Sequence, residues 1–425
     1  MQKPSRRPLT AGFGLRKTLP TLIPLSLVLA VSCAPATQKI YTVDEVRAQV
    51  LQRAEASVVD KIIVPFEIDE EIRQLARSAT KDMISNDDKT RALVDAIISR
   101  TGMSISYDWL SNKTARQVFR EGRGNCLAYT NLFIGMAREV GLDAVYVDVT
   151  TIERVSKEAE VIVNNGHITA GIPDGPEVTM IDFTSTPERE YQGAKILDDF
   201  EAIANYYNNQ GFLYGYFAER ADAMEAGVDP LEAELLMYET ALDVVPNFPR
   251  ARNNLGVALK RRGRVDEAIE QYKLALEADA KFSEARSNLG SAYYSQGRVE
   301  DAIAEFERAA KNSGSNGYFY HHLGVIQLQQ GNLDEAAKQF KKALSKESKL
   351  SDARFFLGEV YLRQGKEKDA IREYQKTLEN DPNYLSARTK LELLGAPLPK
   401  KLATTAEEAE TISADPIVRR PPRRR

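Results

Sequence analysis

The sequence predicts two parts of different fold class, an α+β domain in the first half and an all-α array of helical repeats in the second. Helical spacing of apolar residues after Cys126, and two strand-like segments around residues 173–176, predict the first part. Glycines that recur every 34 residues from Gly256 predict the second. A chain of 425 residues is long enough for two domains, and its net charge of -4 creates no general attraction for a polyanion.

The first 32 residues have the order of a bacterial export signal. Basic residues between Arg6 and Lys17 precede an apolar run at residues 22–31, which is too short for a comfortable membrane span. The run ends in Ser32-Cys33 and resembles a lipoprotein signal, which implies removal of residues 1–32 and a lipid on Cys33. An ordinary cleaved signal peptide or a retained anchor is the alternative. We therefore expect an exported protein, lipid-anchored on the periplasmic side of the bacterial cell envelope at the outer membrane.

After a linker at residues 33–41, an α+β domain with N-terminal helices is expected at residues 42–212. Its first helix begins at Thr42-Val43-Asp44-Glu45, which is a capping-box pattern. The N-terminal helices are predicted near residues 43–57, 69–83 and 87–99. We expect them to pack around the helix that follows Cys126.

Cys126 is predicted to lie in the first turn of a helix. The stretch Gly122-Arg123-Gly124-Asn125 precedes it, and apolar residues follow at three- and four-residue spacings as far as a stop at Gly141. The unsatisfied N–H groups and positive dipole at a helix N-terminus favour a thiolate, which is the nucleophilic form of cysteine. The alternative is a small, buried, structural cysteine.

The number of cysteines bears on this choice. The chain has two, and if Cys33 carries a lipid, Cys126 is the only thiol left, so no intramolecular disulfide can form. A lone thiol in an oxidising compartment is exposed to oxidation without any structural gain. This favours a chemical role for Cys126.

A β-hairpin is predicted around the turn at residues 173–176, with strands at residues 163–171 and 178–183. An earlier strand is predicted at residues 143–152, where side chains alternate. If the hairpin is symmetric about Asp174-Gly175, the residues at 167 and 182 face each other directly. A register shifted by one residue would place them on opposite faces of the sheet.

His167 is the only one of the three histidines outside the repeats, and Asp182 is its predicted neighbour across the hairpin. A cysteine nucleophile needs a base, commonly histidine, and the histidine needs a third group to orient it. Cys126, His167 and Asp182 supply these types in chain order. The alternative is a half-buried strand histidine and a turn-forming aspartate.

Residues 107–184 resemble the transglutaminase-like (papain-like) cysteine enzyme superfamily. The matching pieces are Tyr107, Thr114-Ala115-Arg116-Gln117-Val118-Phe119, Gly122-Arg123-Gly124-Asn125-Cys126, Val140-Gly141-Leu142-Asp143-Ala144, His167 and Ile181-Asp182-Phe183-Thr184. The resemblance implies a papain/transglutaminase-like α+β fold, with Cys126 as nucleophile, His167 as base and Asp182 as the group that orients the imidazole. Members often carry an acidic residue where this chain has Ala128 and an aromatic residue where it has Ile168-Thr169.

The second half is a repeat array at residues 213–395. Sets of equivalent residues recur 34 residues apart: Gly256, Gly290, Gly324 and Gly358; Gly263, Gly297, Gly331 and Gly365; Ala268, Ala302, Ala336 and Ala370; Tyr272, Phe306, Phe340 and Tyr374. This period, with small residues where helices cross, resembles the tetratricopeptide repeat (TPR) and implies an all-α solenoid. Four full repeats are expected at residues 249–384, a degenerate repeat at 215–248 and a capping helix at 385–394.

The repeat resemblance also implies a groove that binds a protein or peptide. By their position in the repeat, its lining residues would be Asn253, Lys260, Arg261, Tyr294, Tyr318, His321, Phe355 and Arg363. No metal site is expected at His321 and His322, since adjacent positions diverge by about 100° around a helix and no acidic or thiol cluster joins them.

Residues 396–425 are predicted to form a disordered basic tail that ends in Arg423-Arg424-Arg425. A solubilising end is the simpler interpretation, with an anionic membrane or envelope polymer as the alternative partner; no nucleic acid is expected outside the cytoplasm. No Walker loop, dinucleotide fingerprint or metal-ligand cluster occurs, so no cofactor is expected.

These patterns predict an exported lipoprotein whose thiol domain acts on amide bonds by acyl transfer, as a peptidase, an amidase or a transglutaminase. The repeats would recruit a protein partner or the substrate. The alternative is a non-catalytic envelope scaffold or assembly factor that acts through its repeats, because a fold alone does not establish activity.

Overall fold

The computed structural model describes residues 39–52, 62–101, 106–107, 110–150, 155–158, 161–164, 167–175, 177–183, 193–218, 229–312 and 316–399. The predicted export signal, Cys33 and residues 400–425 of the basic tail lie outside the described residues. Within the described parts, no helix is both long enough and apolar enough to cross a membrane.

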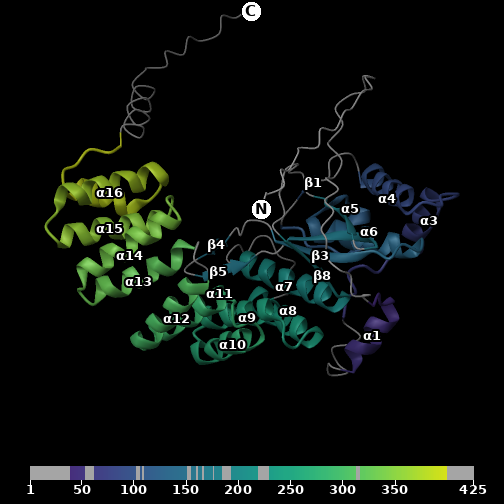
Figure 1. Cartoon of the computed structure of the whole chain (residues 1–425), viewed down its shortest axis with the longest axis horizontal. Helices are drawn as coiled ribbons and strands as arrows, with labels where there is room; N and C mark the ends of the chain where they lie inside the picture. Colours follow the sequence, from purple (N-terminus) through teal and green to yellow (C-terminus); the bar gives the residue numbers. More distant parts are fainter. Residues whose placement is uncertain are drawn as a thin grey trace, which may run out of the picture. The chain divides into compact units, whose positions relative to one another are not determined.

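The chain divides into two compact units (Figure 1). The first contains residues 65–152 and 166–198, and the second contains residues 41–64 and 153–165 together with everything from Asp199 onward. The first unit combines helices with a small antiparallel sheet, and the second is dominated by paired helices. This confirms the predicted fold class, an α+β domain followed by an all-α solenoid.

The first unit is built around a four-stranded antiparallel sheet in the order β7-β6-β3-β8. Its strands are β3 (Val145–Thr150), β6 (His167–Asp174), β7 (Glu177–Ile181) and β8 (Gly193–Leu197). A short parallel pair, β1 (Ser106–Tyr107) with β2 (Arg123–Gly124), lies ahead of the cysteine. The helices are α3 (Glu70–Ala79), α4 (Asn86–Thr101), α5 (Ala115–Glu121) and α6 (Cys126–Glu139).

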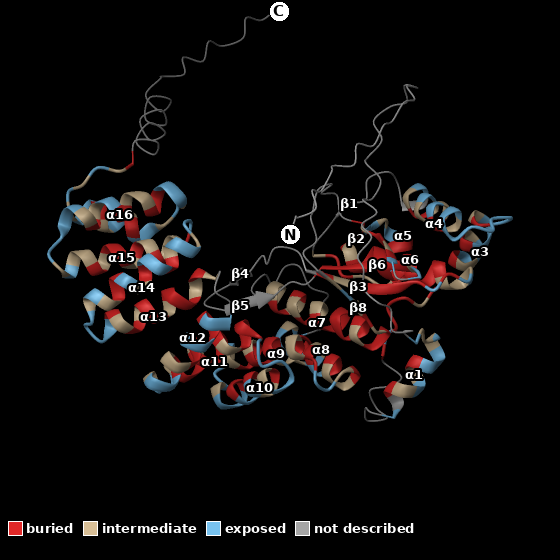
Figure 2. Cartoon of the chain, in the orientation of Figure 1, coloured by how far each residue is buried: buried red, intermediate tan, exposed pale blue. Residues whose placement is uncertain are grey.

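Helix α6 is the centre of this unit. Every residue from Leu127 to Ala137 is buried, and the helix appears almost wholly in the colour of buried residues in Figure 2. It packs against β3 and β6 on one side and against α3, α4 and α5 on others, as an all-round apolar helix must. The predicted helix start at Cys126 and the stop are confirmed, because α6 ends at Glu139 and Gly141 has a φ of 78°.

The predicted register of the hairpin is wrong by two residues. Strands β6 and β7 pair Ala170 with Ile181 and Asp174 with Glu177, so the turn begins at Gly175, and its centre is not Asp174-Gly175. A shift of two keeps every side chain on its own face of the sheet, because side chains alternate with a period of two.

The second unit begins with α1 (Val43–Leu51), whose Thr42 and Glu45 form the predicted capping box. The hairpin of β4 (Val155–Glu158) and β5 (Val161–Asn164) also belongs to this unit, and β5 contacts α9 and α11. The sequence did not predict this hairpin as a separate element. The remaining helices follow in antiparallel pairs.

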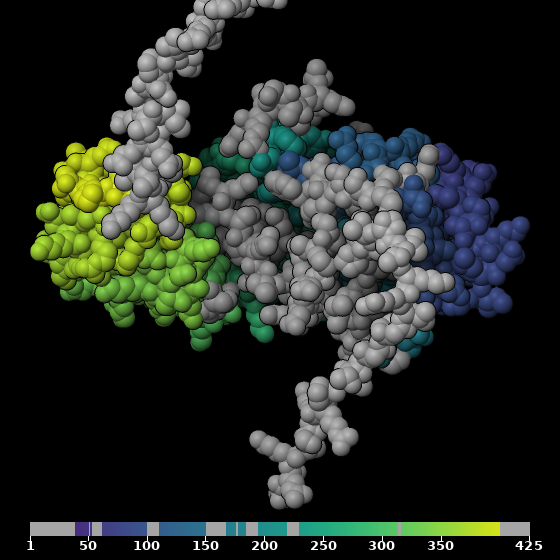
Figure 3. Space-filling model, turned by 90° about the horizontal axis from the view of Figure 1, so that it is seen from above, coloured from purple at the N-terminus to yellow at the C-terminus, as the bar shows by residue number. Residues whose placement is uncertain are grey.

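The array contains the pairs α7 (Asp199–Ala218) with α8 (Pro230–Val244), α9 (Pro249–Arg261) with α10 (Val265–Ala278), α11 (Ser283–Ser295) with α12 (Val299–Asn312), α13 (Gly317–Gln329) with α14 (Leu333–Lys346), and α15 (Ser351–Arg363) with α16 (Glu367–Asn380). Helix α17 (Leu385–Leu393) follows them. The last repeats, coloured green to yellow, form a continuous body of packed side chains (Figure 3).

The recurring glycines lie where the two helices of a pair cross. A Cβ on Gly256 would lie 2.6 Å from Cε1 of Tyr272, and one on Gly324 would lie 2.7 Å from the same atom of Phe340. These distances are too short for a methyl group, so each glycine lets the next helix bring its aromatic ring onto the backbone. The 34-residue period of glycines and aromatic residues therefore records a repeated helix contact.

Replacing Gly256 with alanine is expected to destabilise the array by about 1 to 3 kcal/mol, because the overpacked Tyr272 ring must move. The matched control is Gly290→Ala, where the added Cβ would lie 3.2 Å from the Phe306 ring and needs a smaller shift. Urea unfolding followed by far-ultraviolet circular dichroism measures both. Equal midpoints for the two variants would contradict the packing argument.

Arginines at a fixed repeat position tie the two helices together in three of the four full repeats. Arg286 donates to Glu305 at 2.9 Å and to the Ala280 carbonyl at 2.8 Å, and Arg354 donates in the same way to Glu373 at 3.1 Å and to the Ser348 carbonyl at 2.7 Å. Arg252 makes the corresponding bonds to Gln271 and the Pro246 carbonyl. In the third full repeat the position holds Tyr320, and the Lys342 amine lies 4.3 Å from its ring centroid.

A second kind of bond joins neighbouring repeats. Gln296 donates to Asp266 at 2.6 Å, and Gln364, which is 68 positions later, donates to Asp334 at 2.9 Å. Each bond runs from the end of one repeat's first helix to the start of the preceding repeat's second helix. The bonds from arginine to a side chain thus lie within repeats, whereas the bonds from arginine to a carbonyl and from glutamine to aspartate join neighbouring repeats.

Candidate active site

The loop before Cys126 is fixed by the side chain and backbone of one residue, Asn125. As the N-cap of α6, its Oδ1 accepts a hydrogen bond from the Ala128 N–H at 2.9 Å, and its own N–H donates to the Ser111 carbonyl at 2.9 Å. Cys126 is therefore the first residue of the helix. Its thiol is free and half-buried, and its N–H is among those that have no partner within a helix.

Small residues allow the loop to approach the first turn of α6. A Cβ on Gly124 would lie 2.8 Å from Cβ of Ala128 and 3.0 Å from Val118. Ala128 is fully buried, so this position presents no side chain to a substrate. The small side chain of Ala128 allows β2 and α6 to pack closely, and an acidic side chain at position 128 would not fit there.

A buried polar network holds the cysteine helix against the sheet. The Tyr146 hydroxyl on β3 donates to Oδ1 of Asn131 on α6 at 2.8 Å, and the Asn131 amide donates to the Lys113 carbonyl at 3.4 Å. Tyr146 and Asn131 are each about 1% exposed. Because buried polar groups are costly without partners, this network favours one position of α6 relative to β3 and the loop before α5.

His167 is the first residue of β6 and lies opposite Val149 of β3. Its Nε2 is 3.2 Å from Oδ1 of Asp182, and its side chain is 7% exposed against 17% for Asp182. His167 also forms a side-chain hydrogen bond with Cys126. Because Nε2 faces Asp182, the other ring nitrogen, Nδ1, is the one available to the thiol. The structure thus brings all three predicted residues together.

The contact between His167 and Asp182 does not use the predicted cross-strand pair. Asp182 follows the last residue of β7, and continuing the observed register places it opposite Thr169, two residues from His167. The two side chains are diagonal neighbours on one face, a spacing that longer side chains can bridge. Next to Asp182, Phe183 stacks on Tyr129 of α6 with ring centroids 5.9 Å apart, which fixes the end of the hairpin on the cysteine helix.

The pKa of His167 reflects opposing effects. Burial alone would lower this pKa, since it disfavours the charged imidazolium. The hydrogen bonds to Asp182 and Cys126, and the negative charges of both groups, act in the other direction and together raise the pKa of His167 from 6.5 to about 10. The site therefore stabilises the protonated form of His167.

The eight predicted groove residues have different environments. Asn253, His321 and Phe355 are buried, whereas Arg363 is exposed and donates to the Leu328 carbonyl at 3.4 Å. The others are Lys260, which donates to Ser291 at 2.6 Å, Arg261, which pairs with Glu234, and the half-buried Tyr294 and Tyr318. Burial, with Glu347 and Asp352 nearby, raises the pKa of Tyr318 to about 12.

Sequence reasoning missed a chain of buried amides in the array. Asn254 donates to Asn208 at 2.9 Å, Asn253 donates to Asn254 at 3.1 Å, and Asn288 donates to Asn253 at 2.8 Å. These residues link α7, α9 and α11. The signal was present in the sequence, because Asn254 and Asn288 are 34 positions apart and so occupy the same place in their repeats.

Comparison with protein families identifies both parts of the chain. Residues 73–172 match the transglutaminase-like superfamily, and this range includes Cys126 and His167 but not Asp182. Residues 258–297 and 290–331 match the TPR repeat, and residues 322–384 match the tetratricopeptide repeat. The chain therefore contains a transglutaminase-like domain followed by TPR repeats. No curated protein matches the chain.

Solved structures with a similar array include TTC0263, a thermophilic TPR protein of Thermus thermophilus, at 24% identity over 43% of this chain and 96% of that one, with a TM-score of 0.36. The MamA structure has 24% identity over 38% of this chain and 98% of its own, with a TM-score of 0.33. YrrB, described as a TPR protein with an unusual peptide-binding site, has 20% identity over 44% of this chain and 92% of its own, with a TM-score of 0.33.

Proposed function

We propose that the transglutaminase-like domain is a thiol enzyme that transfers acyl groups from amides, with Cys126 as nucleophile, His167 as acid and base, and Asp182 as the group that orients the imidazole. The observation that carries this proposal is the position of His167, hydrogen-bonded to both Asp182 and Cys126. A histidine with a raised pKa beside a cysteine at a helix start is the arrangement that generates a thiolate.

The chemistry follows from this geometry. The Cys126 thiolate attacks the amide carbonyl carbon, the carbonyl oxygen becomes an oxyanion, and the Cys126 N–H is the natural first donor to it. His167 then donates its proton to the leaving amine as the C–N bond breaks, which leaves a thioester on Cys126. In the second step His167 removes a proton from water or an amine, which attacks the thioester and frees the thiolate. Water gives hydrolysis, and an amine gives a new amide.

The proposal is tested with hydroxylamine, which intercepts the thioester whichever acceptor is natural. Casein peptides and hydroxylamine are incubated with the protein, and hydroxamates are measured by their colour with ferric iron. We expect hydroxamate from the wild type and background amounts from Cys126→Ala. The matched control is Cys33→Ser, which removes the other cysteine and is expected to retain the activity. Equal yields from Cys126→Ala and the wild type would refute a Cys126 thioester.

The TPR repeats support a second component of the proposal, recruitment of a protein partner or of the substrate. TPR arrays present extended surfaces to other chains. The alternative remains a non-catalytic scaffold that acts through the repeats alone. In a deletion strain, full complementation by Cys126→Ser would favour the scaffold, since the enzyme needs its thiol.

From the sequence pattern alone, we further propose that the protein is exported and carries a lipid on Cys33. Mass spectrometry of the N-terminal peptide of the mature protein tests this. A peptide that still contains residues before Cys33 and carries no lipid on Cys33 would contradict the proposal.

A further inference from the structure

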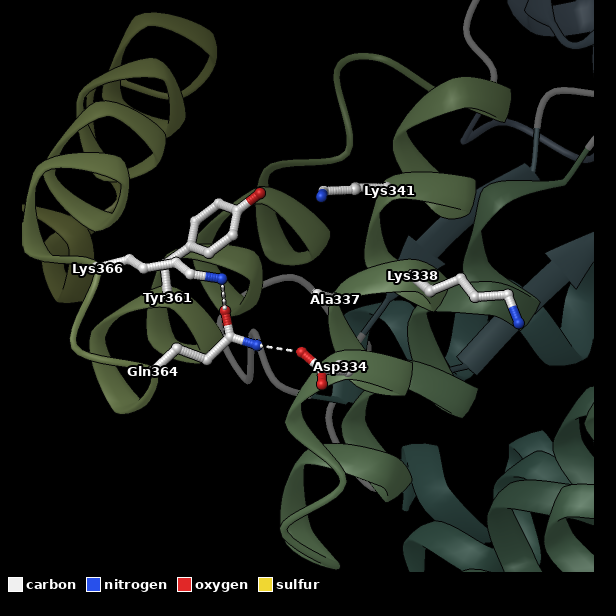
Figure 4. Close-up of a pocket in the computed structure, with 7 residues that line it drawn as sticks. All are labelled: Asp334, Ala337, Lys338, Lys341, Tyr361, Gln364 and Lys366. Carbon is white, nitrogen blue, oxygen red and sulfur yellow. Dashed lines mark hydrogen bonds between the residues drawn. The ribbon is translucent and has the colours of Figure 1, made fainter.

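We propose that a surface pocket between the last two full repeats binds a phosphate-type anion (Figure 4). The pocket has a volume of about 340 Å³ and lies between α14 and the end of α15. It is lined by Asp334, Ala337, Lys338, Lys341, Tyr361, Gln364 and Lys366. Three of these side chains are cationic and one is anionic, so the pocket is basic.

Two of the lysines have no carboxylate partner within the described parts of the chain. Lys338 pairs with Glu335 at 3.1 Å, and Asp334 accepts a hydrogen bond from the Gln364 amide at 2.9 Å. Lys366 donates a hydrogen bond to the amide oxygen of the same Gln364 side chain at 2.9 Å. Both hydrogen bonds of Gln364 are drawn in Figure 4. Lys341 has no ion pair among the described residues and makes only a ring contact. The local positive charge is therefore not neutralised.

Both amines converge on one aromatic side chain. The Nζ atom of Lys341 lies 5.6 Å from the ring centroid of Tyr361, and that of Lys366 lies 6.0 Å from it. In Figure 4 the Tyr361 hydroxyl and the Lys341 amine point toward one another. Two ammonium groups around a phenol, which can also donate a hydrogen bond, give a set of donors that an anion can bridge.

The repeat fold does not require this arrangement. At the junction one repeat earlier, the positions of Lys338, Lys341 and Lys366 hold Ala304, Glu307 and Asn332. At the junction before that they hold Glu270, Lys273 and Arg298, and Arg298 pairs with Asp301 at 2.7 Å. Only the junction lined by Lys341 and Lys366, among these three, leaves two cations without a carboxylate.

The charge and size of the pocket favour a phosphate group. A phosphate monoester carries about -1.5 to -2 charges at neutral pH and three acceptor oxygens, which suits two lysines and a hydroxyl better than a single carboxylate does. Since one water molecule occupies about 30 Å³ in the liquid, the pocket can hold a phosphoryl group and part of the molecule that carries it. A soluble phosphorylated molecule and a phospholipid headgroup share this chemistry.

The test is isothermal titration of the full chain with inorganic pyrophosphate, and separately with phosphatidylcholine vesicles that do or do not contain phosphatidylglycerol, at about 20 mM salt, where screening is weak. The pocket variant is Lys341→Gln/Lys366→Gln. The matched control, Lys273→Gln/Lys342→Gln, removes two exposed lysines outside the pocket. Circular dichroism melting checks that both variants fold.

We expect the pocket variant to bind about tenfold more weakly and the control to bind as the wild type does, since two exposed charge contacts are lost. Binding of pyrophosphate alone identifies a soluble ligand, and binding of the anionic vesicles as well identifies a headgroup. In the wild type, pyrophosphate should also shift the NMR signals of the Tyr361 ring. The proposal is overturned if neither probe binds, if both double variants weaken binding equally, or if the Tyr361 signals do not move.

Discussion

Replacing His167 with alanine is expected to slow the alkylation of Cys126 by iodoacetamide between ten- and a hundredfold at about pH 6.5. A free cysteine, with a pKa of about 8.5, has roughly 1% thiolate at that pH. The pKa of His167 is raised to about 10, so the imidazole is positively charged at this pH, and we expect a positive charge beside the sulfur to favour attack by Cys126. The expected increase in the alkylation rate is smaller than a hundredfold, because a thiolate with a lowered pKa is a weaker nucleophile.

The measurement uses a Cys33→Ser background, in which Cys126 is the only thiol. Alkylation rates are recorded from about pH 5 to pH 9 by mass spectrometry, over the range in which an ordinary thiol begins to ionise. The control is His322→Ala, which removes a histidine from the repeat array and should leave the profile unchanged. A profile that is the same with histidine and with alanine at position 167 would make Cys126 a structural residue and direct attention to the repeats.

Replacing Asp182 with asparagine is expected to lower the pKa of His167 well below about 10 and to reduce hydroxamate formation by about 10² to 10⁴-fold. The amide has the shape of the carboxylate but lacks its charge, so burial, which lowers the pKa, is opposed by the thiol group alone. A histidine is protonated below its pKa and neutral above it. At about pH 8 the wild-type imidazole is therefore charged, whereas in the variant a larger fraction is neutral.

The titration of His167 is followed by NMR of the histidine ring carbons. The chain has only three histidines, so few signals have to be told apart. The spectrum of His167→Ala identifies the His167 signal. Asp174→Asn is the matched control, since it removes an exposed carboxylate of the same hairpin and should not move the titration. An unchanged His167 titration in Asp182→Asn would falsify the role given to this carboxylate.

The start of the cysteine helix could be predicted because its signals are local. Asn125 caps the helix, apolar residues follow at helical spacing, and Gly141 takes the left-handed conformation just beyond the end. Each signal acts within a few residues of the element that it specifies. Tertiary contacts then add to the local preferences and do not override them.

The register of the hairpin could not be predicted, because residues 173–176 offer more than one centre. Asp-Gly is a common pair at the centre of a tight turn, which favours Asp174-Gly175. In the structure Asp174 is paired with Glu177, and Gly175, with a φ of 58°, takes the first central place. A glycine in this conformation suits a two-residue turn equally well, and the sequence contains nothing that chooses between the two centres.

The first helix pair of the array was misplaced for a different reason. The sequence predicts a degenerate repeat at residues 215–248, but α7 starts at Asp199 and packs on α8. Gly211 lies under the Tyr238 ring as Gly256 lies under Tyr272, yet the first two are 27 positions apart and the second two are 16 apart. The insertion between α7 and α8 hides the contact from a search for a constant period.

The groove residues show the limit of reasoning from repeat position. Position in the repeat predicts which side of a helix a residue occupies, but exposure depends on the neighbouring elements. Asn253, His321 and Phe355 are buried, and their contacts include ones that the period does not encode: Asn253 accepts a hydrogen bond from Asn288 of the next repeat, and Phe355 packs in an apolar cluster with Leu391 of α17. Such contacts join residues of different repeats, whose side chains vary even where the backbone repeats.

The two bond sets of the array have an evolutionary consequence. The bond of Arg286 to Glu305 begins and ends within one repeat, whereas the bond of Gln364 to Asp334 joins adjacent repeats. A duplicated copy of residues 331–364 would carry both Asp334 and Gln364, so it would bring the donor and the acceptor of the bond between repeats with it. An added repeat of this kind would therefore meet its neighbour through a contact that already holds the array.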